Sequence, residues 1–377
     1  MIDPSAVFNS LKEKGVGVFS GVPDSLLKDF CAYVTTHTSG PDHVITANEG
    51  AAVGIAAGHH LATGGLGLVY MQNSGLGNVV NPLLSLADPD VYSIPMLLLV
   101  GWRGEPGVRD EPQHVKQGRV TLQLLECMEI PHRLLSDDPQ VAESDLAWAV
   151  ATARDRSAPV ALVVRKGTFS PCKLESTGQE SLSLSRERAI ECLVDEIEPR
   201  AMVVSTTGMI SRELFEIRKN QGQPPGLDFL TVGSMGHASS IAFGVAAQVP
   251  DRSVYCFDGD GSVLMHLGSI AVLGGVAPAN FKHIVINNGC HDSVGGQPTV
   301  GFDIALGRIA EACGYTCLEC VEDEASLRAA MARLRETDGP VMLEIRVRKG
   351  ARSDLGRPTT TPLENKEGFM RTLGAVD

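Results

Sequence analysis

The strongest constraint on this chain is the repeated alternation of short apolar segments with helical segments. Leu66–Met71, Met96–Val100 and Val160–Val164 are apolar stretches of the length typical of a strand. A strand without alternating polar positions is buried on both faces, as in a parallel sheet covered by helices on both sides. The sequence therefore predicts an α/β fold built from doubly wound parallel sheets.

The alternation occurs twice, once in each half of the chain. Strands are predicted in the first half also at Val16–Ser20 and His43–Ala47, and in the second half at Ala201–Ser205, Phe229–Gly233, Val254–Phe257, His283–Ile286 and Val341–Arg346. Between them, residues 169–185 are rich in Ser, Gly and polar residues without a period, which indicates a linker. At 377 residues we predict two α/β domains, 1–168 and 186–350, with no middle domain. Residues 351–377 are predicted to be a polar tail that could fold back over a site.

Charge argues against a polyanionic partner. The chain has 32 Lys and Arg against 45 Asp and Glu, a net charge of −13, so we expect neither nucleic acid nor a membrane surface as a partner. No apolar stretch is long enough to cross a membrane, and Met1–Pro4 lacks the features of a signal peptide, so the predicted location is cytoplasmic.

The cysteine pattern predicts free thiols. The nine cysteines are odd in number and scattered. Cys313, Cys317 and Cys320 have a spacing found in some iron–sulfur proteins, but a strand through Tyr315–Val321 places positions 317 and 320 on opposite faces. We therefore expect no cluster there.

Two motifs follow neighbouring predicted strands. Asp258-Gly259-Asp260-Gly261-Ser262 follows one strand and Asn287-Asn288 follows the next, so both lie at carboxyl ends of a parallel sheet. Asp260 and Asn288 supply the hard oxygen ligands that Mg²⁺ prefers. Gly259 and Gly261 allow a diphosphate to approach, and Ser262 is expected to open a helix that favours an anion. Two ordinary turns are the alternative interpretation.

This spacing resembles the cofactor motif of thiamine-diphosphate-dependent enzymes. In that family the Asp and second Asn hold the metal together with a backbone carbonyl two residues later, which implies Asp260, Asn288 and Cys290 here. The family also has a glutamate that hydrogen-bonds the cofactor's pyrimidine, and Glu49 within Thr46–Ala52 is similar to it. Taken alone, Glu49 would be an acid interacting with a helix dipole.

Further segments resemble the phosphonopyruvate decarboxylase family: Gly21–Leu27, Gly101–Gly107, Asp110–His114, Gly233–His237, His291–Thr299 and Asp354–Thr359. The related sulfopyruvate decarboxylases share the first and the fourth of these, and tend to divide the two domains between chains. One fused chain and the His291-Asp292 pair favour the phosphonate family. The chain departs from the family pattern at Met209, where a polar or basic residue is expected.

The resemblance implies decarboxylation of 3-phosphonopyruvate to phosphonoacetaldehyde and CO₂, with thiamine diphosphate and Mg²⁺ as cofactors. The cofactor-binding positions that it implies are Glu49, Gly208, Ser234, Met235, Gly236, His237, Gly259, Asp260, Gly261, Ser262 and Asn288. Besides Glu49, the candidates for a general acid that returns a proton to the reacting carbon are Asp24, His114 and His291. Asp24 could equally be a turn residue after Pro23.

The substrate carries a carboxylate and a phosphonate, so its pocket must supply positive charge. The candidates are Arg103, Arg109, Lys116 and Arg119 in one loop region, and Lys349, Arg352 and Arg357 in the tail. Solvated surface loops are the alternative for both groups. Because domains of different subunits meet in this family, the resemblance also implies a homodimer or homotetramer with active sites at the subunit interface.

Other functions fit less well. A sulfopyruvate decarboxylase is the main alternative, and a non-catalytic cofactor-binding subunit is opposed by the presence of both Glu49 and Asp260. A carboligase or oxidative relative would carry a middle domain for which this chain has no room. A dinucleotide oxidoreductase would need a third glycine after Gly75-Leu76-Gly77. His59-His60, inside a predicted helix, is expected to pack rather than react.

Overall fold

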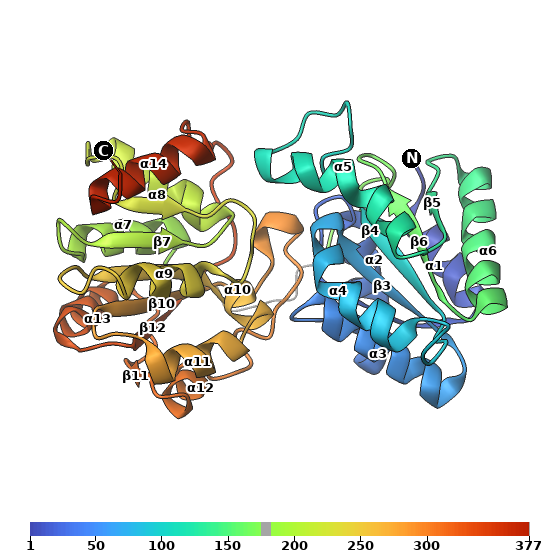
Figure 1. Cartoon of the computed structure of the whole chain (residues 1–377), viewed down its shortest axis with the longest axis horizontal. Coiled ribbons are helices and arrows are strands. Elements are labelled where there is room, and N and C mark those ends of the chain that lie inside the picture. Colours follow the sequence, from blue (N-terminus) through green and yellow to red (C-terminus); the bar gives the residue numbers. More distant parts are fainter. Residues whose placement is uncertain (175–181, 377) are drawn as a thin grey trace. The chain divides into compact units, whose positions relative to one another are not determined.

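The computed structural model describes residues 1–174 and 182–376 and contains two compact units. The first comprises Met1–Thr177 with His291–Gln297, and the second Gly178–Cys290 with Pro298–Asp377. Each unit holds a six-stranded parallel sheet with helices on both faces, so the predicted α/β fold class is confirmed (Figure 1). The exact domain boundaries stay a prediction, and residues 175–181 of the predicted linker lie outside the described residues.

The first sheet has the strand order β2-β1-β3-β4-β6-β5. From β1 the chain passes to the edge strand β2 and then returns to β3 on the other side of β1. The carboxyl ends of β1 and β3 therefore form a switch point, where open α/β sheets bind ligands. The strands are β1 (Val16–Gly21), β2 (His43–Ile45), β3 (Leu66–Gln72), β4 (Met96–Gly101), β5 (His132–Leu134) and β6 (Pro159–Val164).

Helices cover both faces of this sheet because its strands are apolar on both sides. One core layer contains α1 (Pro4–Glu13), α2 (Lys28–His37) and α6 (Pro139–Arg156). The opposite layer contains α3 (Glu49–Thr63), α4 (Leu76–Pro82) and α5 (Pro112–Cys127). Short turns occur at Gly40–Asp42, Asn73–Gly75 and Leu83–Ala87. Helix α1 begins after Asp3, whose carboxylate accepts a hydrogen bond from the backbone N–H of Ser5.

The second sheet has the strand order β11-β12-β10-β9-β7-β8. Its switch point lies between β7 and β9, because the chain visits the edge strand β8 between them. The strands are β7 (Met202–Ser205), β8 (Asp228–Leu230), β9 (Val254–Gly259), β10 (Phe281–Asn287), β11 (Thr316–Cys317) and β12 (Val341–Arg346).

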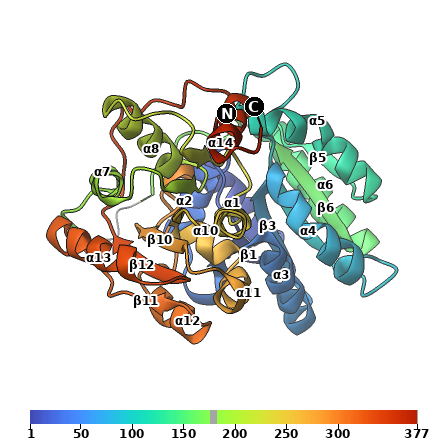
Figure 2. The same cartoon turned by 60° about the vertical axis from the view of Figure 1, so that its left-hand side comes forward.

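The helices of the second unit also form two layers (Figure 2). One layer contains α7 (Arg186–Glu196), α8 (Met209–Asn220) and α13 (Glu324–Glu336). The other contains α9 (Ala238–Ala246), α11 (Gly268–Val276), α12 (Leu306–Ala312) and α14 (Pro362–Leu373). The short helix α10 (Asp260–Met265) follows β9 directly, and a 3₁₀ turn covers Asp292–Val294.

The structure differs from the sequence-based expectations in three places. The short edge strand β5 was not predicted, because only three residues form it. The expected single helix after the Asp-Gly motif is divided into α10 and α11, and it begins at Asp260 rather than Ser262. The predicted tail contains α14, which Thr361 and Glu364 cap reciprocally and which buries Phe369 in the core.

All nine cysteines are free thiols, as predicted. In the part of the chain that the structure describes, every helix is too short or too polar to cross a bilayer. Within the same residues, the cysteines of the iron–sulfur-like spacing do not gather into a group of candidate metal ligands.

Candidate active site

Asp24 lies at the switch point of the first unit. Its carboxylate is fully buried and accepts hydrogen bonds from the Gln72 side chain at the end of β3, at 2.6 Å, and from the backbone N–H of Leu26, at 2.9 Å. A β-carbon on Gly101, the last residue of β4, would lie 2.3 Å from Asp24 Oδ2, so the glycine allows this close approach. Burial raises the pKa of Asp24, although the bond from Gln72 and the charge of Arg103 act in the opposite direction.

Glu49 lies at the carboxyl end of β2, as the first residue of α3. Its side chain is 4% exposed, and one oxygen accepts a hydrogen bond of 2.6 Å from Asn78 on α4. Gly75 borders the carboxylate so closely that a β-carbon there would lie 2.4 Å from Oε1. Glu49 is therefore held in one place by an amide donor and a glycine contact.

Arg103 and His114 lie in the loop region after β4 and at the start of α5. Arg103 binds both oxygens of Asp110, at 2.8 and 2.5 Å, and donates to Ser25 Oγ at 2.7 Å. His114 is 8% exposed, and its Nδ1 atom has no hydrogen-bond partner among the described residues. Burial, with a smaller contribution from the charge of Arg103, lowers the pKa of His114 to about 4. Its imidazole is therefore neutral at pH 7.

In the second unit, the predicted metal ligands meet at the ends of β9 and β10. The backbone N–H of Asn288 approaches Asp260 Oδ1 at 3.4 Å, and the N–H of Cys290 donates to Asn288 Oδ1 at 3.2 Å. Thr299 donates a short hydrogen bond to Asp260 Oδ2. A β-carbon on Gly301 would lie 2.7 Å from the same oxygen. The Asp260 carboxylate is 2% exposed, and burial raises its pKa to about 6.

Ser262 connects three segments at the second switch point. Its hydroxyl accepts hydrogen bonds from Thr206 Oγ1, after β7, at 2.9 Å, and from the backbone N–H of Gly236, after β8, at 3.0 Å. Gly259 is the N-cap of α10, with Gly261 between it and Ser262. One buried hydroxyl on α10 therefore holds the ends of β7, β8 and β9 together.

The remaining predicted positions border this junction. Gly208 is the N-cap of α8 and has a φ of 103°, which a side chain would disfavour. Ser234, with a φ of 47°, and Met235 form the turn before His237, the N-cap of α9. The rings of His237 and His266 are 4.5 Å apart. His266 follows α10 and was not predicted, because no local pattern distinguishes it.

His291 lies in a tight loop after β10. Its backbone N–H donates to Gln297 at 2.8 Å, and its carbonyl accepts from Val294 at 3.1 Å and Gly296 at 3.0 Å. The half-buried loop His291–Gln297 belongs by its contacts to the first unit. These bonds close the loop on itself.

Two family models match this chain. Residues 5–124 match the thiamine pyrophosphate enzyme N-terminal TPP binding domain, and residues 206–345 match the C-terminal TPP binding domain. Phosphonopyruvate decarboxylase of Streptomyces viridochromogenes is 37% identical over 98% of this chain and 94% of that protein. The protein of that name from Streptomyces hygroscopicus is 36% identical over 98% of this chain and 93% of its own length. The chain belongs to the phosphonopyruvate decarboxylase family of thiamine pyrophosphate enzymes.

A more distant relative corrects one sequence-based argument. Sulfopyruvate decarboxylase of Methanosarcina acetivorans is 27% identical over 97% of this chain and 96% of that protein. A sulfopyruvate decarboxylase can therefore also be a single chain that aligns along its whole length. The fused arrangement does not distinguish the phosphonopyruvate decarboxylase family from its sulfonate relatives.

The residues of the second unit fit the cofactor that the family binds. Among the described residues, the donors around the buried carboxylate of Asp260 are all neutral: the Thr299 hydroxyl and the backbone N–H groups of Asn288, Asp260 and Gly261. No positive charge among them balances the buried carboxylate. A divalent cation would compensate this charge, and the glycines of the turn leave space for a diphosphate. Each unit thus carries one group of the predicted residues, Asp24, Glu49 and His114 in the first and the Asp260 group in the second.

Sequence reasoning missed several polar residues at these sheet edges. Gln72 and Asn73 directly follow the apolar part of β3, so their position after a predicted strand could have identified them. Asn73 bonds the backbone of Arg103 and the hydroxyl of Thr121, at 2.8 Å each, and so fixes the loop that holds Arg103. Thr299 lies in an irregular segment, and no pattern in the sequence relates it to Asp260.

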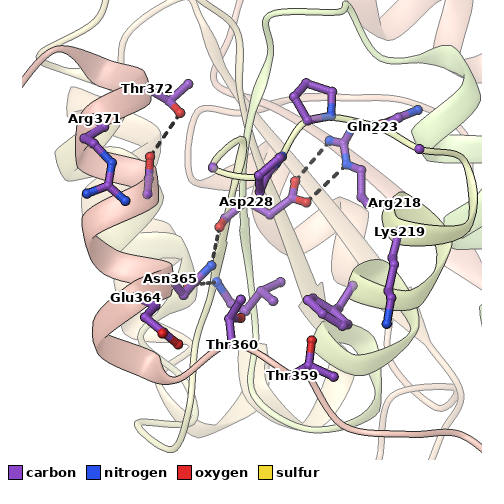
Figure 3. A pocket seen from close by; sticks show the side chains of 17 residues that line it. Arg218, Lys219, Gln223, Asp228, Thr359, Thr360, Glu364, Asn365, Arg371 and Thr372 are labelled. Carbon is purple, nitrogen blue, oxygen red and sulfur yellow. Dashed lines mark hydrogen bonds and ion pairs between the residues drawn. The ribbon is translucent and has the colours of Figure 1, made fainter.

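The second unit also contains a cavity of about 720 Å³ between α8, β8 and α14 (Figure 3). Arg218 binds both oxygens of Asp228 there at 3.1 and 3.0 Å, and Asn365 bonds the backbone of Asp228 and Leu230. These bonds hold α14 on the sheet edge. None of the predicted site residues lines the cavity, so we assign it a structural role.

The raised pKa of Asp260 predicts how stability depends on pH without cofactor. Between the ordinary value of 3.8 and about 6, the folded protein keeps a proton that the unfolded chain has lost, so stability falls as pH rises through this range. Each pKa unit of this shift corresponds to about 1.4 kcal/mol. Between pH 4 and pH 8, the free energy of unfolding of Asp260→Asn should therefore rise by up to about 3 kcal/mol relative to that of wild type. Urea unfolding of the cofactor-free proteins measures this difference.

The exposed Asp251→Asn variant serves as the control and should show no such trend. Thiamine diphosphate with Mg²⁺ should then stabilise the wild type and not Asp260→Asn. A stability difference between the variant and wild type that stays constant from pH 4 to pH 8 would contradict the assigned burial cost.

Proposed function

We propose that this chain decarboxylates 3-phosphonopyruvate to phosphonoacetaldehyde and CO₂ with bound thiamine diphosphate and Mg²⁺. The observation that carries the proposal is the match to two phosphonopyruvate decarboxylases at 36–37% identity over 98% of the chain. The buried acids Asp24 and Glu49 at the carboxyl edge of the first sheet support it, because a subunit that only held the cofactor's diphosphate would not need them. A sulfopyruvate decarboxylase is the second candidate, on the weaker full-length match at 27% identity.

In this proposal the second unit holds the cofactor's diphosphate. Asp260, Asn288 and the backbone carbonyl of Cys290 would bind Mg²⁺, and the segments joined by Ser262 would surround the phosphates. When bound, thiamine diphosphate supplies the nucleophilic carbon and accepts the electron pair released with CO₂. Glu49 would hold a proton at the pyrimidine ring, and the close approach of Gly75 to its carboxylate would restrict the position of that proton.

Among the candidates for the acid that returns a proton to the product carbon, the structure favours Asp24. A proton donor at neutral pH must retain its proton there, and burial raises the pKa of Asp24. His114 is a poor donor as an imidazolium, because its pKa of about 4 leaves it neutral. We propose that Asp24 donates the proton and that His114 acts as a neutral hydrogen-bonding group. Burial lowers the pKa of His291 to about 4 as well, so the same argument makes it the weaker alternative.

Replacing these groups separates their roles. Asp24→Asn should lower kcat by about 10²- to 10⁴-fold, because the proton donor is lost. The decline of wild-type kcat at high pH, which reports loss of the Asp24 proton, should disappear in the residual activity of the variant. His114→Gln should keep that decline. Steady-state pH profiles of the three proteins measure these effects, and a decline retained by Asp24→Asn would assign the proton to another group.

Part of the predicted positive charge is already compensated by carboxylates. Arg103 is paired with Asp110, and Arg352 binds Glu187 at 2.8 Å and Asp354 at 3.2 Å, with a further short contact to Glu216. Arg109, Lys116 and Arg119 are exposed near α5, and Lys349 is exposed in the second unit. We propose that the phosphonate is bound by cations of this exposed group rather than by Arg103 or Arg352.

Substrate selectivity tests the function directly. The kcat/KM should be highest for phosphonopyruvate, intermediate for sulfopyruvate, which has one charge less, and lowest for pyruvate. A missing polar partner in such a site can cost about 10⁴-fold in specificity. The test compares four variants: Arg109→Gln, Lys116→Gln, Arg119→Gln and Lys349→Gln. The variant that removes a phosphonate-binding cation should raise KM for phosphonopyruvate and leave the pyruvate reaction nearly unchanged. Preference for sulfopyruvate in the wild type would favour the second candidate.

We propose that the protein is a homo-oligomer. The outward side of α3 exposes Ala51, Gly54, Gly58 and Leu61, and that of α11 exposes Ala271, Val272, Gly275 and Val276. Small and apolar residues at helical spacing on the surface of two helices are typical of a surface that another helix covers. The family resemblance, in which sites lie between subunits, agrees with this. Whether the assembly is a dimer or a tetramer stays open.

Charge substitutions on these helices test the assembly. Leu61→Asp and Val272→Asp should lower the oligomeric mass in sedimentation velocity, because a carboxylate would be buried without a partner. Leu363→Asp on α14 replaces a leucine of similar exposure, 59% against 73% for Leu61, and should leave the mass unchanged. A wild-type protein that sediments as a monomer would refute the proposal.

A further inference from the structure

A buried polar cluster inside the second unit has no role in the site described above. Cys256 and Asp258 lie two residues apart on β9, so their side chains point to the same face of the sheet. His283 on β10 is in register with Cys256, which places its ring beside the thiol. The three side chains are between 0 and 1% exposed. Strand register therefore brings a thiol, a carboxylate and an imidazole together in the core.

The cluster lacks the hydrogen bonds that buried polar groups require. Within the described residues, neither ring nitrogen of His283 has a hydrogen-bond partner, and neither does the hydroxyl of the nearby Tyr315, whose ring centroid lies 6.2 Å from that of His283. Asp258 accepts a bond from the N–H of Gly259, at 3.0 Å, through Oδ1. Leaving several buried polar atoms without partners costs about 1–3 kcal/mol each. Such a set indicates that something binds between them.

The separations fit one metal ion. The candidate ligand atoms of Cys256, Asp258 and His283 all lie within 4.8 Å of one another. His283 Nε2 and Asp258 Oδ2 are 3.4 Å apart, close to the roughly 3.3 Å that separates two ligands of a tetrahedral ion bound at about 2.0–2.1 Å. Thiolate, imidazole and carboxylate together are typical ligands of Zn²⁺ and not of Mg²⁺, which prefers oxygen alone.

We propose that Cys256, Asp258 and His283 bind a structural Zn²⁺ ion, with a water or the Tyr315 hydroxyl as fourth ligand. Binding releases the proton of the Cys256 thiol to solvent. The ion would link the interior of β9 to that of β10, with Asp258 two residues before Asp260. The site is distinct from the cation site at Asp260 and Asn288 and does not depend on the proposed reaction.

Metal content tests the proposal. Because the cluster is buried, the ion must enter during folding, so untagged protein is produced in medium supplemented with Zn²⁺ or Co²⁺ and purified with thiamine diphosphate and Mg²⁺. We expect about one Zn²⁺ per chain by elemental analysis. The Co²⁺ form should show near-ultraviolet charge-transfer absorption from a thiolate ligand. A wild-type protein without Zn²⁺ or Co²⁺ overturns the proposal, whatever the variants do.

Variants assign the ion to the cluster. Cys256→Ser and His283→Gln should lose the ion, and Cys256→Ser should also lose the thiolate band. Cys192→Ser changes a fully buried cysteine on α7 outside the cluster and should keep both. Asp260→Ala should keep Zn²⁺ as well. If Asp260→Ala loses the ion and Cys256→Ser keeps it, the ion belongs to the cofactor's cation site and the proposal is wrong.

Discussion

The arrangement of this molecule depends on the burial of two parallel sheets on both faces. A strand that is covered on both sides can present reactive side chains only where it ends, because a polar group in its middle would need a buried partner. Helices begin at the same edge, and their free N–H groups favour anions there. Glu49 after β2, Asp24 after β1, Asp260 at the end of β9 and Asn288 after β10 all follow this rule.

The buried acids at these edges oppose folding, and ligands compensate for this cost. Asp260 has a pKa raised by burial to about 6, so the cofactor-free protein carries an unfavourable charge near neutral pH. A cation that binds only the folded state removes that penalty and adds its own binding free energy. The same burial that weakens the empty protein makes the carboxylate a better ligand, because little water competes with the cation.

Much of this could be predicted from the sequence because its signals are local. Apolar runs located the main strands, and the motifs after Phe257 and Ile286 located the cation site, since strand ends of a parallel sheet converge. Contacts between distant segments could not be predicted in this way. Thr299 reaches Asp260 across 39 positions, and Ser262 bonds Thr206 across 56. The capping pair of Thr361 and Glu364 was local, but the polar composition around it concealed a helix that Phe369 and Leu373 pack against the core.

A cationic residue that the sequence places near the site can already be paired with a carboxylate, and it then contributes little to binding an anionic substrate. Arg103 lies in one of the segments that resemble the family, yet Asp110 binds one edge of its guanidinium, Ser25 accepts a bond from the remaining nitrogen and Asn73 fixes its backbone. Although burial acts against it, the bonds from Arg103 and Gly104 keep the pKa of Asp110 below its ordinary value, so the pair remains ionised and has no net charge. Such a pair shapes a loop more than it attracts an anion. A phosphonate must therefore be recognised by cations without a carboxylate partner, by backbone N–H groups at helix starts, or by both. Because the chain as a whole is acidic, the local placement of these few groups decides whether the anion binds.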